Sequence, residues 1–161
     1  MRKVSSGLLF LLLAFVPTMS QAQAKHPNYS GTYVLDTAAS DKGQMTPQKL
    51  TLTIAQTPAS IVIDRAQSSQ MGDMNVKLTY ALDGTTSKNQ LNMGGTMIDV
   101  STVVTWEGDS PVFTSTRKVG DMEVQSVDKW SLSEGGKKLT TSRTFNMGGQ
   151  EMSSKLVLNK Q

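Results

Sequence analysis

The sequence predicts an all-β protein, an antiparallel up-and-down meander of about ten strands that closes, or nearly closes, into a barrel. Three observations lead to this fold class. Apolar and polar residues alternate with a period of two, the alternating segments recur about every 25 residues, and only short turns separate them. An open sheet of this size would leave two long edges, which closure removes. A two-sheet sandwich or a flattened barrel is the alternative.

The first 24 residues match a cleavable signal peptide. Residues 1–3 carry two basic side chains, residues 8–16 are apolar, and residues 22–24 read Ala-Gln-Ala, with small side chains where the peptidase requires them. The apolar run is shorter than the roughly 20 residues that span a bilayer. We therefore expect cleavage after Ala24 and a secreted or periplasmic protein with no membrane anchor.

Residues 25–29 are expected to form a flexible tail, and residues 30–161 a single β-barrel domain without a linker. Without Arg2 and Lys3, 14 of the 16 basic side chains remain against 13 acidic ones. This nearly neutral balance argues against nucleic acid as a partner. The sequence contains no cysteine, which excludes disulfides.

Within the domain, the sequence predicts a first strand around residues 31–35, a last strand around residues 152–158, and four hairpins between them. A large apolar residue marks the end of each outgoing strand: Ile54, Tyr80, Trp106 and Trp130. A turn signal follows each marker, at residues 57–60, 83–84, 107–110 and 133–136. The glycine turns between hairpins, at residues 70–73, 92–95, 119–121 and 146–149, are too short to hold crossover helices. Every strand must therefore run antiparallel to the next.

The start of the domain carries a family resemblance. Residues 29–36 read Tyr-Ser-Gly-Thr-Tyr-Val-Leu-Asp, and Ser40-Asp41 follows. This resembles the opening of small secreted bacterial lipocalin-like proteins, in which an aromatic-Ser-Gly-Thr-Trp segment begins a barrel and a Ser-Asp pair follows the first strand. Tyr33 stands where tryptophan is usual, which departs from a strict lipocalin signature. The resemblance implies a calycin-type barrel and an exported bacterial protein rather than a particular chemistry.

The meander gathers the methionines at one end of the barrel. All eight that follow residue 24 lie in or near the turns between hairpins: Met45, Met71, Met74, Met93, Met97, Met122, Met147 and Met152. Methionine is flexible and suits surfaces that accept varied apolar guests, so this rim is a candidate portal. Alternatively, these side chains plug the barrel end. Met71 and Met74 would form the best thioether pair for Cu(I).

Three arginines occupy matching places in the returning strands. Arg65, Arg117 and Arg143 lie 11, 11 and 13 residues beyond Ile54, Trp106 and Trp130. They share strand parity with apolar residues, among them Ile61, Ile63, Phe113, Leu139 and Phe145. If that face points inward, Asp128 is the one acidic candidate to pair with them, and one carboxylate cannot neutralise three guanidinium groups. This leaves room for an anionic guest such as a fatty-acid carboxylate. Alternatively, the arginines extend into water at the rim.

The residue types of most catalytic sites are missing. His26 is the single histidine and lies in the predicted tail, where we expect it to be solvated. Serine triads, cysteine–histidine dyads and ordinary zinc sites therefore cannot be assembled in the core. We predict no catalytic residue, no metal and no cofactor.

The leading hypothesis is non-enzymatic binding or carriage of a small apolar or amphipathic molecule in the barrel, with the arginines directed at an anionic group. The predicted ligand-binding residues are Tyr80, Trp106, Trp130, Phe113, Phe145, Arg65, Arg117 and Arg143. The main alternative is a secreted structural or partner-binding β module with a filled core, in which the tryptophans are core residues. An enzyme that uses an acid or tyrosine, and a methionine-based copper binder, are less favoured.

Overall fold

The computed structural model describes residues 26–42, 46–70, 72–147 and 149–161. The predicted signal peptide therefore lies outside the described residues. Ten strands and one 3₁₀ turn, η1 (Glu134–Gly136), make up the regular structure of the described residues. The strands are β1 (Gly31–Leu35), β2 (Lys49–Gln56), β3 (Ser60–Ser69), β4 (Gly72–Ala81), β5 (Ser87–Met93), β6 (Thr96–Glu107), β7 (Ser110–Val119), β8 (Met122–Ser133), β9 (Lys138–Met147) and β10 (Gln150–Lys160).

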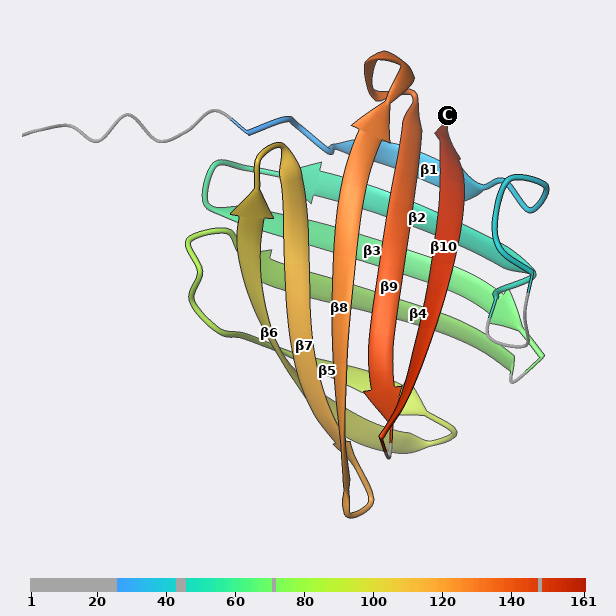
Figure 1. Cartoon of the computed structure of the whole chain (residues 1–161), viewed down its shortest axis with the longest axis vertical. Coiled ribbons are helices and arrows are strands. Elements are labelled where there is room, and N and C mark those ends of the chain that lie inside the picture. The colour runs from blue at the N-terminus through green and yellow to red at the C-terminus, as the bar shows by residue number, and fades with distance from the viewer. Residues whose placement is uncertain (1–25, 43–45, 71, 148) are drawn as a thin grey trace, which may run out of the picture.

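All ten strands belong to one antiparallel sheet, in the order β4-β3-β2-β1-β10-β9-β8-β7-β6-β5. Strands that follow one another in the chain are paired, except β4 and β5. β1 also pairs with β10, where Tyr33 lies opposite Lys160. This pairing joins the two ends of the chain. In Figure 1, β6–β10 run steeply across the front, while β1–β4 cross behind them. The predicted fold, a nearly closed meander barrel, is confirmed.

The barrel stays unpaired at one seam, between β4 and β5, which are the two edges of the sheet. The sequence predicts a paired hairpin here, but side chains replace the backbone ladder. The Asn89 side chain accepts a hydrogen bond from Thr79 N (2.9 Å) and donates one to Thr79 O (3.0 Å). Ser87 Oγ accepts a third from Ala81 N (2.8 Å). Asn89 thus imitates a neighbouring strand at one position, because its amide carries both a donor and an acceptor.

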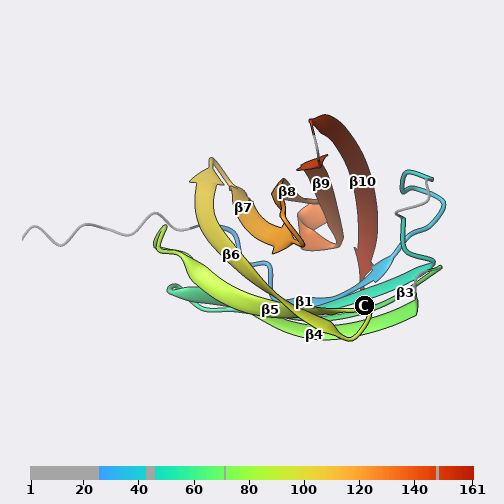
Figure 2. The same ribbon diagram turned by 90° about the horizontal axis from the view of Figure 1, so that it is seen from below.

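One end of the barrel is filled by aromatic and aliphatic side chains, and we call it the aromatic end. The rings of Phe113 and Trp130 lie 4.7 Å apart and those of Tyr80 and Phe113 5.2 Å apart, in tilted and edge-on arrangements that aromatic pairs favour. Tyr33, Leu139 and Leu158 belong to the same cluster and are completely buried. Figure 2 shows the two halves of the sheet facing each other across this interior.

The N-terminal segment, residues 26–30, is fastened across the aromatic end, which differs from the predicted flexible tail. Tyr29 is only 1% exposed, and its hydroxyl donates to the carbonyl of Asp109 (2.9 Å). The Gln56 side chain accepts from Tyr29 N (2.9 Å) and donates to Pro27 O (3.1 Å). The His26 ring stacks on Trp106 with centroids 3.8 Å apart and is half-buried, so His26 is less solvated than predicted. Contacts with residues that are distant in the sequence therefore hold this segment in place.

Gly31 belongs to residues 29–36, the segment that carries the family resemblance, and the structure shows why glycine stands there. Its φ of +146° lies in a region that L side chains rarely adopt, and an added Cβ would collide with Lys160 Cε. Lys160 crosses this position to donate to Ser30 O (2.8 Å), and its ammonium lies 5.5 Å from the centre of the Tyr33 ring. Glycine here allows the two ends of the chain to meet closely.

Candidate ligand-binding site

Four ionisable side chains form a belt inside the barrel, which we call the guanidinium belt: Arg65 on β3, Arg117 on β7, Asp128 on β8 and Arg143 on β9. Each lies on the strand face that carries the buried residues, as the alternating burial along these strands shows. The charges of Asp128 and Arg143 act on the pKa of Arg65 from the other half of the sheet. The predicted inward parity of the three arginines therefore agrees with their placement.

Arg143 is paired with Asp128. The two residues face each other directly in the β8–β9 ladder. Arg143 Nε donates to both carboxylate oxygens (2.8 Å each), and Nη2 lies 2.7 Å from Asp128 Oδ2. Burial would lower the pKa of Arg143, but the charge and the hydrogen bond of Asp128 outweigh it and raise that pKa. Because Arg143 donates to both oxygens of Asp128, this one partner takes up most of the acceptor capacity of the carboxylate.

Arg65 has only a neutral partner among the described residues. Its Nε and Nη2 donate to Gln67 Oε1, at 3.0 Å and 2.6 Å. Burial, followed by repulsion from Arg143, lowers the pKa of Arg65 to about 10. The group is still protonated near neutral pH, so its charge is oriented by Gln67 and not cancelled.

Arg117 is the least satisfied member of the belt. Its Nε is buried and has no hydrogen-bond partner among the described residues. Burial and then the charge of Arg143 lower the pKa of Arg117. A buried donor without a partner costs about 1–3 kcal/mol, more for a charged group, so native structures rarely retain one without a reason. Arg117 is two residues from the end of β7, on the side toward the methionines.

Small hydroxyl side chains surround the belt where bulkier residues would fill a core. Thr102, Ser126 and Thr141 are buried, and Thr102 Oγ1 lies 2.8 Å from Ser115 Oγ. Ser154 faces Arg143 across the β9–β10 ladder. The belt is partly accessible: the Arg143 side chain keeps 40% of its surface exposed, against 14% for Asp128. The interior therefore changes from packed rings to a polar, partly open section.

Tyr80 joins the aromatic end to the belt. Its ring packs on Phe113, and its pKa is raised to about 12, first by burial and then by the charge of Asp128. Trp130 and Phe113 belong to the buried core. Phe145 is buried one inward position beyond Arg143. Trp106 is the predicted site residue farthest from the belt, since it lies at the end of β6 against His26.

The end of the barrel opposite the aromatic end carries inward-facing methionines that are partly exposed. Four described methionines stand on interior-facing positions of their strands and form what we call the methionine rim: Met74, Met93, Met122 and Met152. Met93 is 41% exposed and Met122 50% exposed, although both stand on the inward face. Met97 points outward. Met45 and Met71, and with Met71 the predicted copper pair, lie outside the described residues, as does the side chain of Met147.

The structure adds residues that the sequence analysis missed. Gln67, two positions beyond Arg65 on the same face, could have been found from parity alone. The hydroxyl residues around the belt could also have been found from strand parity. The packing of Tyr29 at the aromatic end had no local signal, because its partners come from distant hairpins.

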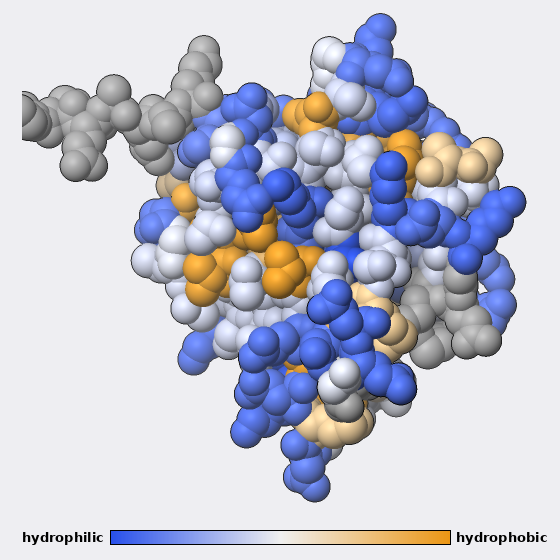
Figure 3. Space-filling model, viewed as in Figure 1, coloured by the Kyte–Doolittle hydropathy of each residue, from blue (hydrophilic) through white to orange (hydrophobic). Residues whose placement is uncertain are grey.

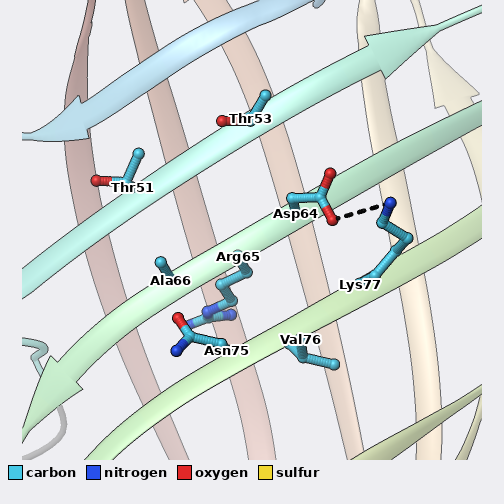
Figure 4. Close-up of a pocket in the computed structure, with 8 residues that line it drawn as sticks. All are labelled: Thr51, Thr53, Asp64, Arg65, Ala66, Asn75, Val76 and Lys77. Atoms are coloured by element: carbon cyan, nitrogen blue, oxygen red, sulfur yellow. Dashed lines mark ion pairs between the residues drawn. The ribbon is translucent and has the colours of Figure 1, made fainter.

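Two hollows of the described surface lie outside the barrel. One, of about 340 Å³, lies on the outer face of β2–β4 and is lined by Thr51, Thr53, Asp64, Asn75 and Lys77, among others. Figure 4 shows Asp64 paired with Lys77 (3.4 Å) beside it, whereas the Arg65 side chain reaches behind the sheet. The other, of about 200 Å³, is lined by Glu123, Gln125 and Asn146. Arg65 is one of the residues that line the first hollow, whereas Arg117, Asp128 and Arg143 line neither.

The described part of the chain contains no group of three His, Cys, Asp or Glu side chains placed to hold a metal ion. It also contains no helix long and apolar enough to cross a membrane.

The fold, though not the sequence, matches solved proteins. No protein-family model matches the chain, and no curated protein matches it in sequence. The wild-type fluorescent protein UnaG aligns over 83% of this chain and 97% of its own, with a TM-score of 0.54 and 16% identity. Secretory abundant heat soluble protein 4 from Ramazzottius varieornatus aligns over 83% and 94%, with a TM-score of 0.54 and 13% identity. At these identities the likeness shows the fold alone, an antiparallel β-barrel closed by a meander of strands.

Proposed function

We propose that this is an exported, non-enzymatic carrier that binds a small amphipathic anion inside the barrel. One observation carries the proposal: three inward guanidinium groups face one carboxylate, and that carboxylate is already paired with Arg143. Arg65 and Arg117 are left with uncompensated charge in a partly buried setting, which is costly unless an anion offsets it. A forked guanidinium group suits carboxylate and phosphate oxygens.

The apolar part of the guest would contact the side chains between the belt and the rim. Phe145, Val100 and Val124 are buried next to the belt on its methionine side. Burial of apolar surface contributes roughly 25 cal/mol per Å², which supplies affinity while the belt supplies orientation. Export is part of this proposal on the strength of the N-terminal segment, residues 1–24.

A filled module that binds a protein partner is the second candidate, and two observations favour it. The aromatic end is packed, and both hollows described above lie on the outer surface. Figure 3 shows hydrophobic side chains on the outer face of the front strands. Val127, on the outward face of β8, is 41% exposed. Such a module would not need an uncompensated interior charge.

Calorimetric titration with dodecanoate separates the two candidates. We expect saturable binding by the wild-type protein and no binding of dodecyltrimethylammonium, which has the same tail and the opposite charge. Arg117→Met should weaken dodecanoate binding by about tenfold, the effect of one lost charge-assisted contact. Lys118→Met removes the same charge from the outward face of the same strand and should leave the affinity unchanged. Absence of dodecanoate binding, or equal effects of the two variants, would favour the filled module.

A further inference from the structure

The charge of the belt specifies the head group of the guest more closely. Arg65, Arg117 and Arg143 contribute three positive charges, and Asp128 is the one acidic side chain among them; the other described carboxylates are exposed or half-exposed on outward positions and turns. After the Arg143–Asp128 pair is formed, two positive charges remain. A singly charged head would leave one of them buried without a counter-charge, whereas a doubly charged head would offset both.

The hydrogen-bond donors of the belt agree with this count. Arg143 directs Nε and Nη2 at Asp128, while Arg65 shares a single acceptor, Gln67 Oε1, between its Nε and Nη2. Arg117 Nε has no acceptor among the described residues. Several guanidinium N–H groups on two side chains are therefore available, which suits a head with three or more acceptor oxygens better than a carboxylate with two.

The two ends of the barrel determine where an apolar tail can go. Toward the aromatic end, Phe113, Trp130 and Leu139 fill the interior, and Tyr29 covers it. Toward the other end, the methionine rim is half exposed on its inward positions. The packed aromatic end therefore blocks a tail that starts at the belt, and the tail would run toward the rim, where flexible thioether side chains adapt to varied apolar surfaces.

We infer that the guest carries a doubly charged, phosphate-like head held by Arg65 and Arg117 beside the Arg143–Asp128 pair, and an apolar tail that leaves past the methionine rim. This inference rests on the proposed function and names the class of ligand for the same site. It also predicts an orientation, with the head deep in the barrel and the tail toward solvent.

The head is tested with decyl phosphate and decyl sulfate at pH 8, by calorimetric titration of the intact protein. The two compounds share the tail and a tetrahedral head, but the phosphate monoester carries nearly two charges, because its second pKa is about 6. We expect decyl phosphate to bind about tenfold more tightly, and Arg117→Met to bring this ratio close to one. Lys118→Met should preserve the ratio. Equal affinities in the wild-type protein would overturn the inference, while dodecanoate binding would still uphold the proposed function.

The direction of the tail is tested with decyl phosphate brominated at its terminal carbon. Trp106 and Trp130 are the two tryptophans of the chain, both at the aromatic end, and bromine quenches tryptophan fluorescence only near contact. We expect binding without quenching in the wild-type protein. Met122→Trp, which places an indole at the rim, should be quenched by the same compound. Quenching in the wild-type protein, or no added quenching in Met122→Trp, would contradict the proposed orientation.

Discussion

The two ends of this barrel obey the same alternating pattern but have opposite physical characters. At the aromatic end, the inward positions carry rings and branched aliphatic side chains that exclude water, and Leu139 is 0% exposed. At the methionine end, inward positions remain half exposed, and Met122 is 50% exposed. The guanidinium belt lies between them. Inward parity thus places a side chain on the interior face, whereas the residues at the barrel ends decide whether that interior is closed to water.

The largest expected effect is a difference in the free energy of unfolding between substitutions at the two ends of the barrel. Leu139→Ala should lower the free energy of unfolding by about 2–5 kcal/mol, because it leaves a cavity in a packed region. Met122→Ala removes a side chain of similar size from the open rim and should change it by about 0.5 kcal/mol or less. Urea unfolding of both variants measures the difference. Similar losses at the two positions would mean that the rim is as well packed as the aromatic end.

The next largest effect should be a difference in stability between two substitutions in the belt. The fold needs Arg143 but does not need Arg117. Arg143→Met leaves Asp128 without its partner and should cost about 1–3 kcal/mol, less than for a fully buried pair because Arg143 is 40% exposed. Arg117→Met removes a charge that has an unsatisfied Nε and should be neutral or stabilising. Urea unfolding midpoints with unchanged slopes would measure both. A larger loss for Arg117→Met would show that Arg117 has a structural partner.

Tyr80 links the two regions and should make stability depend on alkaline pH. Its pKa is about 12 in the folded protein against 10.0 for the unperturbed side chain, so between these values only the unfolded state loses the proton. The contribution of Tyr80 is complete below pH 10 and is lost as the pH rises toward 12, by about 1.4 kcal/mol per pH unit. Tyr80→Phe should reduce the downward slope of unfolding free energy by that amount. An unchanged slope would show that Tyr80 ionises as freely in the folded protein as in the unfolded chain.

The smallest expected effect concerns the seam, which is neither packed like the aromatic end nor open like the rim. Asn89→Ala removes both hydrogen bonds to Thr79 and should cost about 0.5–1.5 kcal/mol. Hydrogen exchange of the Thr79 amide should become faster by up to about tenfold. Gln90→Ala, on the outward face of the same strand, is the control. Unaltered exchange at Thr79 in Asn89→Ala would indicate that β4 and β5 are held together by other contacts.

Much of the fold and the polarity of the site could be predicted, because both follow from local pattern. Ile63 and Arg65 occupy alternate positions of one strand, so the burial of the first places the second on the interior face. The sequence also pointed to Asp128 as the single acidic partner. It could not show that Asp128 meets Arg143 and not Arg65 or Arg117, since this depends on the β8–β9 register. Trp106 matched Trp130 in the repeat, yet it lies against His26, away from the belt.

The meander follows from local sequence pattern, because period-two alternation and the short turns after residue 49 allow only antiparallel neighbours. The same pattern also determined which face of each strand is apolar. Three features required the folded barrel: β1 meets β10, β4 and β5 stay unpaired, and Tyr29 covers one end of the barrel. The physical reason is distance along the chain: local periodicity acts within a strand or hairpin, whereas closure depends on contacts between residues such as Tyr33 and Lys160, which only the complete barrel brings together.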